Sequence, residues 1–323
     1  MSESPSQSES GRGDLRAIID IGTNSVKLLV AEVSGRVVMP LHEVSEQTRL
    51  GRGFYETQQL QSEAIADTVR VLNEFKYAAA HRGARRLQVI ATSAVRDARN
   101  QQQFIDMVWR DVGVKVDVIT GDLEADWVYS GVTSDPALTG KRLLIVDVGG
   151  GSTEFILGEG EQKQFQKSFP LGSVRSLERL AHSDPPTSTE LARCRQEIGD
   201  FIRAEIVPAL LPVIGRTTSS CCLVGTGGAS TIMGRILMQL EKFERERLDG
   251  AVLNLREVHP LVERLWGMDL EARRGIVGLP KKRADVILTG GVIYEQLMEA
   301  LGFEEVRIST RGLRFGGLLQ PRV

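Results

Sequence analysis

The stretch from Leu143 to Glu154 constrains the fold of this chain more than any other. It reads Leu-Leu-Ile-Val-Asp-Val-Gly-Gly-Gly-Ser-Thr-Glu, an apolar run followed by three glycines and three polar residues. Glycines let a backbone turn approach a ligand closely, with amide N–H groups free to face an anion. A carboxylate beside them, here Asp147, suits a hard divalent cation. On this stretch alone two interpretations stay open: a phosphate cradle, and a tight β-hairpin that is merely rich in glycine.

A second copy of the pattern lies near the N-terminus. Ala17–Ser25 reads Ala-Ile-Ile-Asp-Ile-Gly-Thr-Asn-Ser, again an apolar strand with Asp20 near its end, then Gly22 and small polar residues. Two such turns in one chain are far more specific than either alone. They predict two similar α/β domains, each with a phosphate-cradling hairpin, and a ligand in the cleft between them.

The elements that follow each copy also share an order, strand-strand-strand-helix-strand-helix-strand. After the first copy we expect strands 26–33 and 37–44, helix 61–80, strand 87–91, helix 101–112, strand 114–119 and helix 124–132. In the second half we expect strands 143–147, 153–157 and 164–169, helices 173–181 and 190–211, strand 221–224, a helix to 240, helices 257–266 and 284–301 (with a short strand at 286–288 as the alternative), strand 306–309 and helix 313–319.

Turn-rich residues 134–140 mark the predicted domain boundary. We therefore expect a first domain over residues 15–136 and a second over residues 137–323, preceded by a disordered tail at residues 1–14, which are rich in Ser, Glu, Gly and Pro. The last helix is assigned to the second domain, and its packing against the first domain is left open.

Composition excludes several classes of protein. The 323 residues carry a net charge of −2, so no overall basic field attracts nucleic acid. Three cysteines, two of them adjacent, argue against a disulfide framework and for a reducing cytoplasm. No apolar run approaches the ~20 residues that span a bilayer, so no membrane partner is expected.

Six motifs in order make the chain resemble the exopolyphosphatase / guanosine pentaphosphate phosphohydrolase (Ppx/GppA) family, within the actin / Hsp70 / sugar-kinase superfamily. They are Asp20-Ile-Gly-Thr-Asn-Ser25, Ala91-Thr-Ser-Ala-Val-Arg96, Gly121-Asp-Leu-Glu-Ala125, Asp147-Val-Gly-Gly-Gly-Ser-Thr-Glu154, Gly225-Thr-Gly-Gly228 and Arg283-Ala-Asp-Val-Ile-Leu-Thr-Gly290. The resemblance covers nearly all of Ala17 to Leu319. It implies two RNase H-like (actin-like ATPase) domains with the active site in the interdomain cleft, in the short two-domain form, and a homodimer.

The chain departs from the family pattern at three places. Leu123 stands where the family usually has the first of two glutamates, and Asp126 stands where an arginine is common. Arg314-Phe-Gly replaces a more usual Arg-Glu-Gly. The first two departures lend some support to a catalytically weak sensor.

The resemblance assigns catalysis to two carboxylates. Glu124 matches the family's catalytic glutamate, which activates water, and Glu154 matches an acid that positions water or metal. From the residues alone, Glu124 could simply be an acid at a helix N-terminus, where the macrodipole favours it, and Glu154 an exposed strand acid. Asp147 and Asp20 are the predicted ligands of Mg²⁺, with Mn²⁺ as the alternative, and Asp20 could instead cap a strand end.

The remaining candidates bind phosphate. Donors to phosphate oxygens are expected from hydroxyl, amide, guanidinium and backbone N–H groups, on Asn24, Ser25, Thr92, Ser93, Arg96, Gly149, Gly150, Gly151, Ser152 and Thr153. Arg96 could instead form a surface salt bridge with Asp97. A nucleoside or a longer phosphate chain would contact Gly227 and Gly228 and the basic residues Lys281, Lys282 and Arg283, although a plain strand-to-helix turn and a solvated surface are the alternatives.

The resulting interpretation is a Mg²⁺-assisted exopolyphosphatase that releases terminal phosphate from inorganic polyphosphate. One alternative is hydrolysis of the terminal phosphate of guanosine pentaphosphate, with guanosine tetraphosphate or pentaphosphate as substrate or inhibitor. Another, from a different class, is a catalytically weak nucleotide or alarmone sensor.

Overall fold

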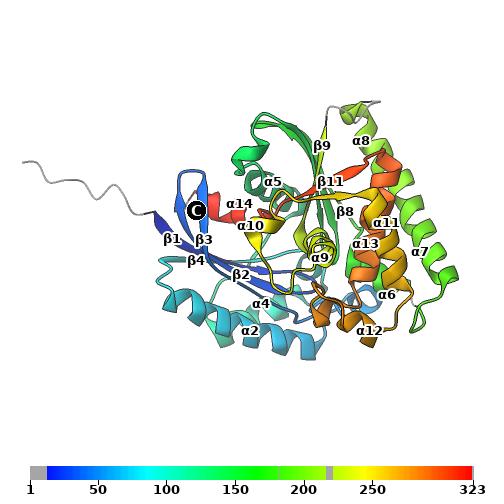
Figure 1. The fold of residues 1–323 in the computed structure, drawn as a ribbon. Coiled ribbons are helices and arrows are strands. Elements are labelled where there is room, and N and C mark those ends of the chain that lie inside the picture. The colour runs from blue at the N-terminus through cyan, green and yellow to red at the C-terminus, as the bar shows by residue number, and fades with distance from the viewer. Residues whose placement is uncertain (1–12, 181, 216–220, 322–323) are drawn as a thin grey trace, which may run out of the picture.

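Two β-sheets, one in each half of the chain, organise the molecule (Figure 1). This computed structural model describes residues 13–180, 182–215 and 221–321. The predicted tail therefore lies outside the described residues, apart from its last two positions. Within the described ranges, no helix is long and apolar enough to cross a membrane.

The first sheet has the strand order β3-β2-β1-β4-β5. Strands β1 to β3 form an antiparallel meander, whereas β4 and β5 run parallel to β1. Their bounds are β1 Asp14–Ile21, β2 Val26–Ser34, β3 Val37–Glu46, β4 Arg86–Ala91 and β5 Asp117–Val118.

The second sheet repeats that order and adds one strand. From the edge at β8 it runs β8-β7-β6-β9-β11, and β10 pairs antiparallel to β11 at the far edge. Its strands are β6 Arg142–Val148, β7 Thr153–Glu159, β8 Gln162–Phe169, β9 Cys222–Thr226, β10 Val252–Asn254 and β11 Glu305–Ile308. The shared order confirms the predicted pair of RNase H-like α/β units.

Helices cover the sheets and join them. In the first half they are α1 Phe54–Thr57, α2 Ser62–His81, α3 Ser93–Arg96, α4 Gln101–Val112 and α5 Gly121–Val132. In the second half they are α6 Ser173–Arg179, α7 Ser188–Phe201, α8 Val207–Ile214, α9 Gly227–Leu237, α10 Arg245–Leu248, α11 Leu255–Trp266, α12 Leu270–Arg274, α13 Ile287–Leu301 and α14 Leu313–Leu319. Short 3₁₀ turns occupy Pro136–Leu138 and Lys281–Arg283.

Four predicted bounds need correction. Asp14, assigned to the tail, already pairs with Val33 in β1. The strand expected over 114–119 shrinks to two residues, because only Asp117 and Val118 have partners on β4. At 286–288 the alternative strand is wrong, since residues 287 and 288 belong to α13.

The fourth correction concerns the single helix expected over 190–211. A π-helical stretch, Ile202–Ile206, separates α7 from α8. Pro208 has no N–H to continue the α-helical ladder, and just before it the N–H of Val207 reaches back five residues to the carbonyl of Ile202. The helix therefore widens by one residue at this point instead of ending.

Two helices form an apolar layer between the sheets. Figure 1 shows α5 and α14 in this position, and their side chains share one buried cluster with both sheets. Phe315 and Trp127 come from the helices, whereas Ile18 comes from the first sheet and Ile145 and Val224 from the second. The end of α14 is also tied to β1, because the Arg16 guanidinium donates to the carbonyl of Leu318 at 2.7 Å. The last helix thus packs against elements of the first half.

This packing depends on a glycine of α14. A Cβ placed on Gly316 would lie 1.7 Å from the carbonyl oxygen of Trp127 in α5. Ordinarily Gly→Ala within a helix stabilises by roughly 0.5–1 kcal/mol. Here the methyl group has to push two backbones apart, so the sign reverses.

We therefore expect Gly316→Ala to lower the free energy of unfolding by about 1–3 kcal/mol, the usual cost of overpacking, as measured by urea denaturation. Gly267→Ala, at the end of α11, is the control, because an added Cβ there has 3.4 Å to its nearest neighbour. It should stay within about 0.5 kcal/mol of the wild type. Equal stabilities for the wild type and Gly316→Ala would contradict the packing argument.

Candidate active site in the cleft between the sheets

The two predicted glycine turns line one cleft of about 530 Å³. Each turn closes its hairpin with the same hydrogen bond, from the N–H of Gly22 to Ser25 in one and from the N–H of Gly149 to Ser152 in the other. They approach so closely that a Cβ on Gly150 would lie 2.9 Å from the Cβ of Thr23. The Asp147–Glu154 stretch is thus a tight hairpin, and its turn lines a cavity.

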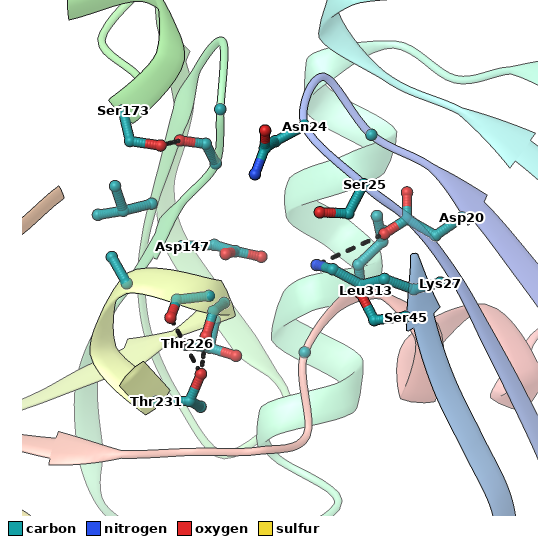
Figure 2. Close-up of a pocket in the computed structure, with 18 of the residues that line it drawn as sticks. Asp20, Asn24, Ser25, Lys27, Ser45, Asp147, Ser173, Thr226, Thr231 and Leu313 are labelled. Atoms are coloured by element: carbon teal, nitrogen blue, oxygen red, sulfur yellow. Dashed lines mark hydrogen bonds and ion pairs between the residues drawn. The ribbon is translucent and has the colours of Figure 1, made fainter. Parts of the chain in front are cut away.

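Five carboxylates line this cleft, and four of them, apart from Glu43, are predicted site residues from four different elements. Asp20 lies on β1, Asp147 on β6, Glu154 on β7 and Glu124 on the first turn of α5. The two aspartates occupy corresponding positions at the ends of the two central strands. In Figure 2, Asp147 points from one wall of the cleft toward Lys27 and Asp20 on the other.

Glu124 is buried at the start of α5 and is held by an arginine. The side chain of Thr120 caps the helix by accepting the N–H of Leu123 at 3.2 Å. Arg96 donates to Oε2 of Glu124 at 3.1 Å and to the carbonyl of Ile119 at 3.1 Å. Glu124 therefore fits both interpretations: it is an acid in the first turn of a helix, and its side chain lines the cleft.

Arg96 contacts a second acid. It was predicted to bind phosphate in the cleft, but it does not line the cavity. Its Nε lies 3.6 Å from Asp97, so the alternative salt bridge is also formed. Arg96 is absent from the cleft lining in the described structure. Its guanidinium thus binds Glu124 without lining the cleft itself. A direct contact of Arg96 with phosphate stays a prediction.

Glu154 is fully inside the cleft wall. Its side chain is 1% exposed, and Oε1 accepts hydrogen bonds from the hydroxyls of Ser152 (2.8 Å) and Ser168 (2.7 Å). The alternative of an exposed strand acid is wrong. Two serine donors fix the carboxylate against the glycine turn.

Most predicted phosphate donors line the cleft together. They are Asn24, Ser25, Thr92, Ser93, Gly149, Gly150, Gly151 and Ser152. Nδ2 of Asn24 and Oγ of Ser93 are buried and have no hydrogen-bond partner among the described residues, so both can donate to a ligand. Thr153 is different, because its hydroxyl donates to the carbonyl of Leu171 at 2.5 Å and its side chain faces away from the cleft lining.

The candidates for chain or nucleoside binding divide into two groups. Gly227, Gly228 and Arg283 line the cleft, and Arg283 reaches Oγ of Ser25 on the opposite wall at 2.5 Å. Lys281 and Lys282 are absent from the lining. The ammonium group of Lys282 instead lies 3.2 Å from Glu46.

Comparison with known proteins matches this geometry to one family. Residues 29–321 match the Ppx/GppA phosphatase family. The chain belongs to the Ppx/GppA phosphatase family. This confirms the resemblance drawn from the six motifs.

Relatives in this family cover nearly the whole chain. It is similar to exopolyphosphatase 2 of Mycobacterium tuberculosis, with 32% identity over 93% of this chain and 96% of the relative. It is also 27% identical to a guanosine-5'-triphosphate,3'-diphosphate pyrophosphatase of Vibrio campbellii, over 96% of this chain but 59% of that protein.

Solved structures agree with the fold. The crystal structure of the Ppx/GppA family member of Aquifex aeolicus matches with a TM-score of 0.76 and 29% identity, covering 95% of this chain and 96% of that one. The fold of an exopolyphosphatase from Cytophaga hutchinsonii, at 24% identity, matches with a TM-score of 0.84 over 94% and 96% of the two chains.

The departures from the family pattern near Glu124 lie outside the cleft. Leu123 is 37% exposed, and Asp126 forms an ion pair with Lys163 of β8. Neither residue lines the cavity. The two changes therefore alter the outer face of α5, and the sensor hypothesis loses the support that they gave it.

Four charged residues of the cleft were not among the predicted site residues: Lys27, Glu43, Arg235 and Arg314. Lys27 lies 3.9 Å from Asp20, and Glu43 and Arg314 form an ion pair on the same wall. The strand register could have revealed Lys27, because the turn after β1 puts residue 27 directly opposite residue 20. Glu43 and Arg314 are 271 positions apart in the chain, and no local pattern brings them together.

Burial raises the pKa of the four predicted carboxylates of the cleft, Asp20, Glu124, Asp147 and Glu154. Burial and then the neighbouring Asp147 raise the pKa of Glu154 to about 7, and burial raises that of Asp147 to about 6, opposed by Lys27. Burial, reinforced by Glu154 and opposed by Arg96, raises the pKa of Glu124 well above its ordinary value. Burial also raises the pKa of Asp20. The folded protein therefore holds protons that the unfolded chain would release.

A stability test follows for Glu154. Its pKa is 4.5 in the unfolded reference and about 7 in the fold, so stability falls as the pH rises between these values. Glu154→Gln cannot ionise. Between pH 5 and pH 8, in buffer containing a chelator, the wild type should lose more unfolding free energy than the variant, by on the order of 1–3 kcal/mol.

Glu159→Gln, at the exposed end of the same strand, is the matched control and should follow the wild-type pH profile. The measurement is urea denaturation at each pH. Parallel profiles for wild type and Glu154→Gln would contradict the raised pKa.

Proposed function

We propose that this Ppx/GppA phosphatase is an exopolyphosphatase, which hydrolyses the terminal phosphoanhydride bond of inorganic polyphosphate. The observation that carries the proposal is the position of Glu124, a buried carboxylate that lines the same cavity as the two glycine turns. Phosphoryl transfer to water needs charge neutralisation on the phosphoryl oxygens and a group that orients or deprotonates the water. The turns would neutralise charge on the phosphoryl oxygens, and Glu124 would orient or deprotonate the water.

In this mechanism Glu124 accepts the proton of the attacking water. Burial makes its carboxylate a stronger base than an exposed glutamate, and the Arg96 hydrogen bond fixes the orientation of the carboxylate. Glu154, held by its two serines, would position the same water. The backbone N–H groups of Gly149 to Ser152, with Asn24 and Ser93, would donate to the phosphate oxygens.

A divalent metal fits the two aspartates. Phosphatases of this family generally depend on such a metal, and we propose Mg²⁺, with Mn²⁺ as the alternative. Oδ1 of Asp20 is buried and unpartnered in the described structure, and Asp147 lines the cavity opposite it. Two aspartates suit Mg²⁺, because it binds one or two carboxylates and keeps water or substrate oxygens. When bound, it would neutralise charge on the phosphate oxygens.

Guanosine pentaphosphate is the second candidate substrate. The cavity extends past Asp147 to Gly227 and Gly228 and to Phe243, whose side chain is 43% exposed. An exposed aromatic ring on the wall can stack on a nucleobase. A relative named for such a substrate is also similar over 96% of this chain.

The cellular setting stays a proposal from the sequence. Cys194, Cys221 and Cys222 are all free thiols, in keeping with a cytoplasmic protein. A homodimer remains an expectation from the family resemblance.

We expect Glu124→Gln to lower kcat by about 10²–10⁴, the usual contribution of a general base, with phosphate release from long-chain polyphosphate as the assay. Asp122→Asn is the matched control, since Asp122 lies two residues earlier and is exposed, and its activity should equal that of the wild type. Full activity of Glu124→Gln would remove Glu124 from the assigned role.

A substrate panel tests the function itself. We expect the wild type with Mg²⁺ to release phosphate from polyphosphate faster than from guanosine pentaphosphate or ATP, and a chelator to abolish the release. Faster hydrolysis of guanosine pentaphosphate would favour the second candidate. No turnover of any substrate would favour a sensor.

A further inference from the structure

A short segment of the first half is bonded to the second half beside the cleft. This strap, residues 49–57, joins β3 to α2 and includes α1. Arg49 forms an ion pair with Asp285 at 2.9 Å. Farther along the strap, the N–H groups of Gly53 and Tyr55 donate to the carboxylate of Glu178 on α6, at 2.7 and 3.4 Å. The strap is therefore fixed to the second half at two separate places.

Tyr55 is the strap residue that reaches the glycine turn. The guanidinium of Arg175 lies 4.3 Å from the centre of the Tyr55 ring. The hydroxyl groups of Tyr55, Ser93 and Thr23 converge on Gly151, where a Cβ would lie 2.4 Å from the first two and 3.0 Å from the third. Ser93 lines the cleft, whereas Tyr55 does not. Tyr55 therefore lies behind residues that line the cavity and contacts the cavity only through them.

Arg175 connects the Tyr55 ring to the backbone of the turn. Its Nε donates to the carbonyl of Gly151 at 2.7 Å, and its terminal nitrogen lies 3.7 Å from Asp97. The adjacent N–H groups at the start of α6 hold the rest of the turn, since Val174 donates to the carbonyl of Gly150 at 2.8 Å. The turn is thus hydrogen-bonded to α6. Within the described residues, the bond from Arg175 is the only side-chain hydrogen bond found at Gly151.

The direction of one N–H group depends on this bond. The carbonyl of Gly151 and the N–H of Ser152 belong to the same planar peptide unit. Holding the carbonyl therefore fixes the direction of that N–H. Gly151, on one side of this peptide unit, would otherwise leave the peptide plane more freedom to rotate.

We propose that Tyr55 is a positioning residue of the phosphate site: by stacking on Arg175 it holds that guanidinium on the Gly151 carbonyl and fixes the turn from Gly149 to Ser152. The stacking is a cation–π contact, which restrains the guanidinium plane as well as its position. The role rests on the proposed function, because it matters for catalysis only if the turn binds phosphate.

Hydrogen exchange tests the structural part without using activity. In Tyr55→Ala we expect amide exchange over residues 149–153 to rise about tenfold, the size of effect that a lost cation–π contact gives. Tyr55→Phe keeps the ring and should exchange like the wild type. Tyr77→Ala, which removes a 65% exposed tyrosine from α2, is the matched control.

The outcomes separate a positioning role from a local one. Exchange that rises in the strap alone, with residues 149–153 unchanged, would overturn the proposal. Equal effects of Tyr55→Phe and Tyr55→Ala would overturn the route through Arg175.

Kinetics with polyphosphate give the second readout. Tyr55→Ala should raise KM about tenfold with kcat within about threefold of the wild type, as expected when binding common to substrate and transition state is lost, and Tyr55→Phe should restore KM. A loss of kcat at unchanged KM would contradict this role. A wild type that releases no phosphate from any substrate would instead refute the proposed function, and the exchange result would still decide the role of Tyr55.

Discussion

The apolar layer of α5 and α14 between the two sheets is the contact on which the cleft depends. It buries side chains from both central sheets in one cluster, so the two halves share a core on one side and open onto the cavity on the other. Because α5 begins at the cavity, this layer also places Glu124 on the cavity that both turns line. Close approach of the helices requires glycine at position 316. The position of the proposed base is therefore set by hydrophobic packing.

Electrostatics in the cleft favour a ligand that brings cations. Burial raises the pKa of Asp20, Glu124, Asp147 and Glu154, and for the last three repulsion by a neighbouring carboxylate adds to the effect. Lys27 and Arg96 offset part of that cost. A divalent cation held by these aspartates, as proposed, would offset more, by favouring their charged forms. The same cluster that weakens the fold at high pH is thus suited to a metal and a polyanion together.

Much of the fold and part of the site could be predicted from the sequence, for physical reasons. The two strand-Asp-glycine patterns are local, and each ends where the parallel strands of its sheet end, so Asp20 and Asp147 were both placed correctly on the cleft. Thr153 shows the limit, because its hydroxyl turns to Leu171 through strand geometry that the motif does not encode. Arg314 and Glu43 meet only because α14 packs on the first half. A local pattern of residues in the sequence does not reveal such a tertiary contact.

Several basic groups of the cleft already have protein partners, and this affects how a polyanion can bind. In the lining, Arg283 is bonded to Ser25 and Arg314 to Glu43. Both pairs join the second half to the first. A phosphate chain that competes for Arg283 or Arg314 would exchange an interdomain contact for a contact with substrate. The bonds at Arg49 and Glu178 lie outside the cavity lining, so the strap can keep the two halves together during such an exchange.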